Sequence, residues 1–296
     1  MRLSGRAASV FGYRKDWLAV MPKIKKVAIQ GYSGCFHEEA ARQFYAGRRI
    51  GIVECETFEG EYLELEAGRA DAVVMAIENT ISGGLLPNFE LLRQYGRKVK
   101  GEVYLRIVQN LMALPGQTID DIREVRSHYM DFNQTRKFFK KHPNITLVES
   151  EDTALSAARV AREHLMGVGA VASALAAEKF GLEILQPGIE TYKQNHTRFL
   201  VMDDGISIPE EKIDKASLCF TLPHKPGALA HILTVLSFYD MNLTRIQSLP
   251  IPGREWQYFF YADIKFGSYE RYQQAIAAVL PLMEDLQILG EYKAAL

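Results

Sequence analysis

The chain has 296 residues, 48% of them hydrophobic, and its 35 Lys and Arg residues nearly balance its 36 Asp and Glu residues, so the formal net charge is −1. This composition is that of an ordinary soluble protein of about two domains. The balanced charge excludes a basic surface for nucleic acid, and no run of about 18 apolar residues is present that could cross a membrane.

The N-terminal segment is basic, with Asp16 as its one acid before Val27. It superficially resembles a targeting segment, but no apolar core of signal-peptide length follows the charges, which argues against secretion. We interpret residues 1–25 as a disordered extension or an over-long gene start, with Met21 as a plausible initiator. The three cysteines are scattered without metal-ligand spacing, which favours a reducing compartment, and we expect the cytoplasm.

From Val27 onward, short β-branched runs alternate with amphipathic stretches. The predicted strands are 27–29, 51–53 and 72–77, and the predicted helices are 38–45, 58–67 and 87–95. This βαβα order predicts a mostly parallel sheet with helices on both faces, in which ligands bind beyond the carboxyl ends of the strands.

A second set of alternating elements follows a longer apolar segment at 103–114. Its predicted strands are 124–127, 146–148 and 168–171, and its predicted helices are 133–141, 153–164 and 172–180. The chain then returns to the first sheet through a strand at 198–202. Two α/β lobes joined by crossing strands predict a cleft between the lobes.

A polar segment at 204–215, with Gly205 and Pro209, predicts a linker. Beyond it the predicted strands are 217–221, 241–247, 257–264 and 288–292, and the predicted helices are 226–239 and 268–286. The order βαββαβ is the ferredoxin-like pattern. Such a sheet has exposed edges that proteins commonly cover by pairing subunits, so we expect at least a dimer.

Small polar side chains stand at the ends of three predicted strands. Asn79 follows the strand at 72–77, Ser127 ends the strand at 124–127, and Thr197 and Arg198 begin the returning strand. If these strand ends converge, their hydroxyl and amide side chains line a cleft that could hold a small anion. The chain has no dinucleotide fingerprint, phosphate loop or zinc motif, so we expect neither cofactor nor metal.

These segments, with the turn at 31–36, closely resemble the prephenate dehydratase family over residues 26–203, and residues 216–296 resemble the ACT amino-acid-sensing domain. The resemblance implies a catalytic domain of the two-lobed type II periplasmic-binding-protein kind, with one lobe at 26–105 plus 190–203 and the other at 106–189. It also implies a lyase that expels a ring hydroxyl and carbon dioxide from prephenate to give phenylpyruvate, without cofactor or metal.

The resemblance also implies roles for individual residues. Thr197 would donate a hydrogen bond to the leaving hydroxyl, directly or through a water; Asn79 would orient the substrate, and Ser127 and Gln134 would contribute from the second lobe. Arg198 would pair with a substrate carboxylate, or point away and pair with Glu78, and side-chain alternation leaves both open. The further substrate-binding candidates are Ser33, Gly34, Thr80, His128, Thr153 and Phe199.

Structural interpretations of several candidates stay open. The turn from Gly31 to Gly34 could present backbone N–H groups and the Ser33 hydroxyl to an anion, or only reverse the chain. Thr153 fits a helix cap, which is compatible with a ligand contact. His128 could carry a proton or only orient a neighbour.

One segment departs from the family pattern. The usual Ser-His-Pro-Gln-Ala-Leu-Ala-Gln-Cys reads Ser-His-Tyr-Met-Asp-Phe-Asn-Gln-Thr at residues 127–135. The serine, the histidine and the later glutamine are kept, whereas the Pro-Gln pair is lost. We expect activity to survive with a somewhat altered substrate fit.

The segment 224–229 resembles the ACT loop that closes over phenylalanine at a subunit interface. The second ACT signature, usually Glu-Ser-Arg-Pro, reads Gln-Ser-Leu-Pro at 247–250, so an acid and a cation are missing and the strength and sign of regulation stay open. An ACT domain retained only for dimerisation is the alternative. The effector-binding candidates are Gly227, Ala228, Leu229, Asn242, Leu243, Gln247 and Ser248, in a homodimer or homotetramer.

Three other functions compete with prephenate dehydration. Arogenate dehydratase would run the same chemistry on a substrate whose amine replaces the keto group. A non-catalytic amino-acid sensor would not need Asn79, Ser127, Gln134, Thr197 and Arg198 together. A periplasmic solute-binding protein would need a signal peptide and has no use for the fused ACT domain.

Overall fold

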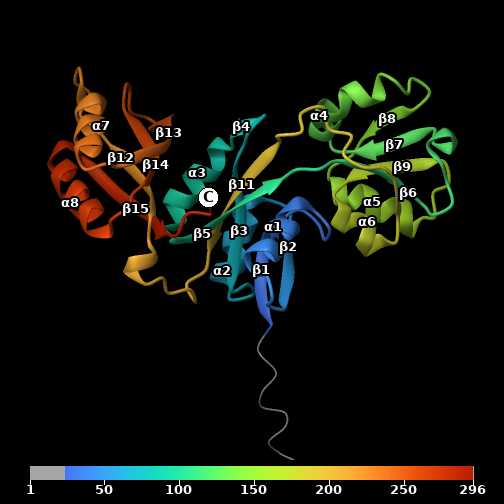
Figure 1. The fold of residues 1–296 in the computed structure, drawn as a ribbon, viewed down its shortest axis with the longest axis horizontal. Helices are drawn as coiled ribbons and strands as arrows, with labels where there is room; N and C mark the ends of the chain where they lie inside the picture. Colours follow the sequence, from blue (N-terminus) through green and yellow to red (C-terminus); the bar gives the residue numbers. More distant parts are fainter. Residues whose placement is uncertain (1–23, 296) are drawn as a thin grey trace, which may run out of the picture.

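The computed structural model describes residues 24–295, so almost all of the extension predicted at 1–25 lies outside the described residues. Three parts lie in a row (Figure 1): the C-terminal domain at one end, the first lobe in the centre and the second lobe at the other end. None of the helices within residues 24–295 is long and apolar enough to cross a membrane.

The first lobe is built on five long strands and three helices. Its elements are β1 (Lys25–Gln30), α1 (Phe36–Phe44), β2 (Ile50–Cys55), α2 (Phe58–Glu66), β3 (Ala72–Asn79), the short β4 (Gly83–Gly84), α3 (Leu86–Tyr95), β5 (Val99–Arg106) and the returning β11 (His196–Met202). Local sequence sets the helix ends: Thr57 accepts a hydrogen bond from the Gly60 N–H at the start of α2, and Gly96, with φ 61°, ends α3 in the left-handed conformation.

The strands of the first lobe run in the order β5-β11-β3-β1-β2. β1 is parallel to β2 and β3, whereas β11 is antiparallel to β3 and β5. Residues of α1 are buried on one face of this sheet, and residues of α2 and α3 on the other. The register between β11 and β3 places Thr197 opposite Asn79, so two predicted site residues meet at one sheet edge.

The second lobe is a five-stranded sheet with helices on both faces. Its elements are β6 (Asn110–Ala113), a 3₁₀ turn at Ile119–Asp121, β7 (Glu124–Ser127), α4 (Tyr129–Phe139), β8 (Thr146–Glu149), α5 (Thr153–Arg162), β9 (Val168–Ala172), α6 (Ala174–Phe180) and β10 (Glu183–Gln186). The strand order is β10-β6-β9-β7-β8. The apolar segment predicted at 103–114 is divided between β5 and β6, which belong to different sheets, and β10 was not predicted.

The C-terminal domain has the predicted βαββαβ order. Its elements are a 3₁₀ turn at Glu210–Lys212, β12 (Lys215–Thr221), α7 (Ala228–Phe238), β13 (Asn242–Pro250), β14 (Tyr258–Lys265), α8 (Tyr269–Val279), a second 3₁₀ turn at Leu280–Leu282 and β15 (Asp285–Tyr292). The helix predicted at 268–286 was too long, because Pro281 cannot donate the next helical hydrogen bond and the chain becomes a strand at Asp285.

The C-terminal domain continues the sheet of the first lobe. Its strand order β13-β14-β12-β15 leads directly to β5, and Gly290 of β15 pairs with Val99 of β5. Any side chain at position 290 would collide with the Val99 backbone, so glycine permits this close approach. Strand β15 of the C-terminal domain therefore lies against the lobe that carries Thr197.

Candidate active site

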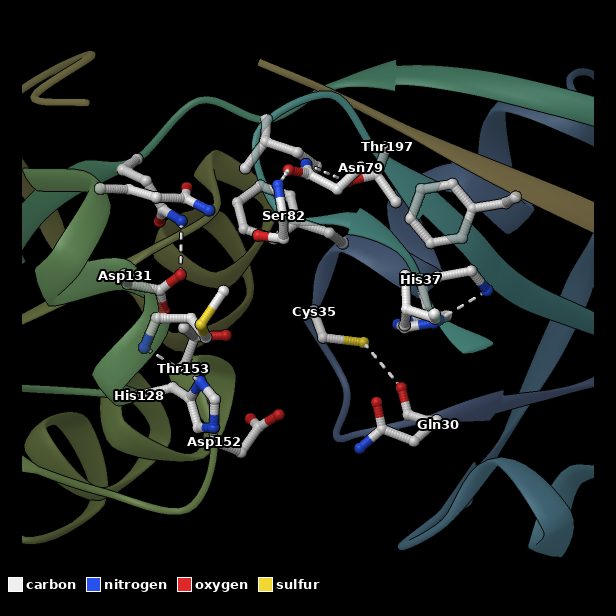
Figure 2. Close-up of a pocket in the computed structure, with 18 of the residues that line it drawn as sticks. Gln30, Cys35, His37, Asn79, Ser82, His128, Asp131, Asp152, Thr153 and Thr197 are labelled. Carbon is white, nitrogen blue, oxygen red and sulfur yellow. Dashed lines mark hydrogen bonds between the residues drawn. The ribbon is translucent and has the colours of Figure 1, made fainter. Parts of the chain in front are cut away.

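A cavity of about 320 Å³ lies between the two lobes (Figure 2). Its size is within the range usual for small-molecule sites. Six of the residues predicted from the sequence line it: Asn79, His128, Gln134, Thr153, Thr197 and Phe199. The first lobe and β11 therefore form one wall of the cavity, and α4 and α5 of the second lobe help to form the other.

A line of hydrogen-bonded polar side chains joins the two walls. Asn79 Nδ2 donates to Thr197 Oγ1 at 2.9 Å and to Asn195 Oδ1 at 2.7 Å, and Asn195 Nδ2 donates to Gln134 Oε1 at 2.8 Å. Because the Thr197 oxygen accepts from Asn79, its own proton is free to be donated to a ligand. Asn79 is itself fixed, since its Oδ1 accepts from the backbone N–H groups of Ile81 and Ser82.

Sequence reasoning missed Asn195 as a site residue. This asparagine is fully buried and connects the amide of Asn79 on the first lobe to that of Gln134 on the second. The signal was present, because Asn195 stands two residues before Thr197 in the same polar cluster. A buried amide with partners on both sides holds the wall in one geometry.

The wall formed by the first lobe is uncharged. Burial lowers the pKa of His37 to about 3, and its Nε2 accepts a hydrogen bond from the Ala76 N–H at 3.3 Å. Burial also raises the pKa of the Cys35 thiol to about 12. Both side chains face the cavity in Figure 2 and are neutral at physiological pH, so this wall binds ligands through hydrogen bonds and apolar contact.

A buried carboxyl group, Asp131 at the start of α4, lines the opposite wall (Figure 2). Gln109 Nε2 donates to Asp131 Oδ1 at 2.6 Å, and Ser127 Oγ lies 3.0 Å from Asp131 Oδ2. Burial raises the pKa of Asp131 to about 7, although the hydrogen bonds from Ser127 and Gln109 oppose the shift. Sequence reasoning missed both Asp131 and Gln109.

Replacing Asp131 with asparagine is expected to stabilise the fold increasingly as the pH rises. The pKa of this carboxyl is raised from 3.8 to about 7 on folding, so the stability of the wild type falls between about pH 4 and pH 7, where the folded state keeps a proton that the unfolded chain has lost. The gain should be about 2 kcal/mol at pH 5 and about 4 kcal/mol at pH 8. Urea unfolding at both pH values measures it, and a gain independent of pH would contradict the raised pKa.

Ser127 lies behind the cavity wall and not in it. Its side chain is fully buried, and its hydroxyl lies 2.8 Å from the Val171 carbonyl oxygen as well as beside Asp131. In the structure the Ser127 hydroxyl therefore contacts Asp131 and does not line the cavity.

Thr153 lines the cavity, as predicted for a ligand contact. It is not the cap of α5, because the cap is Asp152, whose Oδ1 accepts a hydrogen bond from the Leu155 N–H at 2.8 Å.

Arg198 is placed away from the cavity, which corrects its prediction as a partner for a substrate carboxylate. It is 2% exposed, and its guanidinium donates to Glu102 at 2.7 Å, to Glu78 at 3.3 Å, to Asp263 and to the Tyr292 hydroxyl at 2.9 Å. Successive side chains of a strand point to opposite faces, so the neighbour of Thr197 turns toward the C-terminal domain. The alternative in which Arg198 pairs with Glu78 is the one that the structure shows.

Two backbone N–H groups of the turn at 31–34 already donate hydrogen bonds to side chains of the protein. The Ser33 N–H donates to Glu54 at 2.7 Å, and the Gly34 N–H donates to Glu38 at 2.7 Å, which also binds Lys179. These N–H groups are therefore not available to an anionic substrate.

Thr80 serves the backbone and does not line the cavity. Its hydroxyl donates to the Gln194 carbonyl oxygen at 3.1 Å and accepts from the His196 N–H at 3.0 Å. This pair of bonds fixes the approach of the chain to β11. The structure therefore places Thr80 beside the start of β11 and not among the residues that line the cavity.

The site is thus a cavity between the two lobes of an α/β protein, and a βαββαβ domain is fused to one of these lobes. A family model described as prephenate dehydratase matches residues 27–206. The chain therefore belongs to the prephenate dehydratase family and is a lyase.

Curated relatives match nearly the whole chain. A bifunctional chorismate mutase/prephenate dehydratase of Aquifex aeolicus is 33% identical over 94% of this chain and 76% of that protein. Arogenate dehydratase 5 of Arabidopsis thaliana is 32% identical over 90% of this chain and 67% of that protein.

Solved structures share the fold. A protein described as GqqA, a novel type of quorum quenching acylase, has a TM-score of 0.82 at 29% identity and covers 92% of this chain and 98% of that one. The prephenate dehydratase of Arthrobacter aurescens in complex with L-Phe has a TM-score of 0.79 at 28% identity and covers 90% of this chain and 89% of that one.

Proposed function

We propose that this chain catalyses the decarboxylating dehydration of prephenate to phenylpyruvate in the cavity between its lobes. The observation that carries the proposal is the hydrogen-bonded line from Gln134 through Asn195 and Asn79 to Thr197, which leaves the Thr197 proton free at the cavity wall. Family membership supplies the reaction, and this geometry supplies a donor for its leaving group.

The proposed reaction breaks two bonds of the substrate ring and forms an aromatic system. The ring carboxylate leaves as carbon dioxide, its electron pair moves into the ring, and the C–O bond to the hydroxyl breaks with uptake of one proton to give water. Thr197 donates a hydrogen bond to the departing oxygen, and Asn79 holds the Thr197 oxygen in place. Loss of the ring carboxylate is favoured where the cavity stabilises this group less than water does.

The test is a prephenate assay with the purified full-length chain and no added cofactor. We expect a product with the absorbance of phenylpyruvate, formed in proportion to the enzyme added. A well-folded chain that binds an aromatic amino acid but leaves prephenate unchanged would instead support the non-catalytic sensor.

We further propose that phenylalanine is an effector bound by the C-terminal domain as an ACT domain in a homodimer or homotetramer. The candidate residues lie at the start of α7 (Gly227, Ala228 and Leu229) and on β13 (Asn242, Leu243, Gln247 and Ser248). β13 is the first strand in the sheet order and pairs with β14 on one side. Its other side is therefore an edge that a second subunit can pair with.

Adding phenylalanine to the prephenate assay tests this regulatory proposal. We expect the rate to change with phenylalanine concentration and the mass in light scattering to be at least that of a dimer. A rate that does not respond, in a chain that still dimerises, would leave the domain with assembly as its only role.

We also propose a cytoplasmic location. The three cysteines are all free and buried, which fits this proposal.

A further inference from the structure

The cavity wall opposite Thr197 contains a polar group that the protein leaves unsatisfied. Gln109 is 1% exposed and lines the cavity; its Nε2 binds Asp131, but its Oε1 is buried with no hydrogen-bond partner among the described residues. Turning the amide over would leave the other atom without a partner instead. A buried amide that faces a cavity and lacks a partner is satisfied when a ligand supplies one.

The hydrogen bonds around Ser127 show how Asp131 is held. The Ser127 hydroxyl has a single proton, yet its oxygen lies 2.8 Å from the Val171 carbonyl oxygen and 3.0 Å from Asp131 Oδ2. A carbonyl oxygen has no proton to give, so both contacts are satisfied at once only when the carboxyl group supplies the second proton. Asp131 can therefore be held uncharged, so that its carboxyl group donates one hydrogen bond to Ser127 and accepts another from Gln109.

The charge of the cavity is unusual for a substrate with two carboxylates. Asp131, Glu151 and Asp152 all line it, and among the described residues that line it none is a lysine or an arginine. A doubly charged anion meets the carboxyl groups of Glu151 and Asp152 here, whereas the ammonium group of an amine-bearing substrate is attracted to carboxylates and favours the ionised form of Asp131. Asp131 stands where the usual family segment has alanine, so this one carboxyl group departs from the family pattern.

The geometry points to Asp131, positioned by Gln109 and Ser127, as the residue that distinguishes an amine from a keto group on the substrate side chain and favours the amine-bearing substrate, arogenate. This inference rests on the proposed function. The leaving hydroxyl and the side chain stand at opposite ends of the substrate ring, and Figure 2 shows Thr197 and Asp131 on opposite sides of the cavity. With the hydroxyl at Thr197, the side chain lies toward Asp131 and Gln109.

Asp131 can meet either substituent, but not equally well. As a carboxylate it accepts a charge-assisted hydrogen bond from an ammonium group, while the free oxygen of Gln109 accepts a second one. A keto group has no proton to offer, so it leaves the Gln109 oxygen without a partner and gains only a neutral hydrogen bond from the protonated Asp131.

The experiment is to measure kcat/KM for arogenate and for prephenate with the full-length chain and its Asp131→Asn variant. We expect the wild type to prefer arogenate at least tenfold, and Asp131→Asn, which keeps the shape but cannot become a carboxylate, to lower the arogenate-to-prephenate ratio at least tenfold. The ratio separates recognition from a general loss of folding or turnover. Asp131→Ala, which restores the usual family residue, should shift the ratio in the same direction.

Glu39→Gln is the control, because it replaces a partly buried carboxyl that does not line the cavity. Its ratio should equal that of the wild type. A wild type that prefers prephenate, or a ratio that neither Asp131 variant changes, would overturn this inference and leave the proposed function standing. A folded wild type that converts neither substrate would overturn the proposed function and the inference together.

Discussion

Replacing Thr197 with alanine is expected to lower kcat for prephenate by about 10²–10³-fold, because it removes the donor aimed at the leaving hydroxyl. The fold should tolerate the change. Asn79 Nδ2 keeps Asn195 Oδ1 and the His196 carbonyl oxygen as acceptors after the Thr197 oxygen is lost. Steady-state kinetics and urea unfolding of the same preparation measure the two effects separately.

Thr197→Ser is the matched control, since it removes only a methyl group and keeps the hydroxyl. It should retain most of the turnover that alanine loses. If serine and alanine reduce kcat equally, the methyl contact and not the hydroxyl matters, and Thr197 is not the donor. A Thr197→Ala variant with wild-type kcat would give the donor role to another group on the cavity wall.

The partnership of Thr197 with Asn79 could be predicted because it depends on strand ends. Each residue closes or opens a strand of clear periodicity, and strands that are neighbours in one sheet bring their ends together. The same reasoning failed for Arg198, because adjacent strand residues face opposite sides and the sequence does not say which side is the cavity.

Asp131 and Gln109 could not be predicted from strand ends. Asp131 lies within the first turn of α4, which begins at Tyr129 and was predicted to begin four residues later, at Asn133. Gln109 lies in the crossing segment between β5 and β6. Their contact depends on how that crossing segment packs against α4. This packing is a tertiary result that hydrophobic periodicity does not contain.

The fold was predictable for a related reason, and its errors are local. Alternating strands and helices define the two lobes, and the order βαββαβ defines the C-terminal domain. The docking of that domain on β5 was not predicted, because its edges were expected to pair with another subunit. It depends on Gly290 beside Val99 and on a group of buried charges contributed by both parts.

Replacing Arg198 with methionine is expected to destabilise the protein by about 3–5 kcal/mol, because it leaves buried carboxylates without their cation. Arg198 comes from the first lobe, whereas its partners Asp263 and Tyr292 come from the C-terminal domain. Glu102 keeps Lys215, whose Nζ lies 2.8 Å away, so the uncompensated charge falls mainly on Asp263. Urea unfolding measures the loss, and Arg97→Met, which breaks an exposed pair with Asp204, should cost no more than about 1 kcal/mol.

A second substitution separates the orphaned charge from lost packing. In Arg198→Met/Asp263→Asn the carboxylate that lost its cation is neutral, while the asparagine can still accept a hydrogen bond from the Ser217 hydroxyl. If the charge causes the damage, the double variant should be more stable than Arg198→Met by at least about 1 kcal/mol, although each single substitution destabilises. Additive losses would mean that Arg198 holds the C-terminal domain to the first lobe by shape alone. Because Arg198 follows Thr197 directly on β11, the kcat of the double variant then tells whether the catalytic wall depends on that docking.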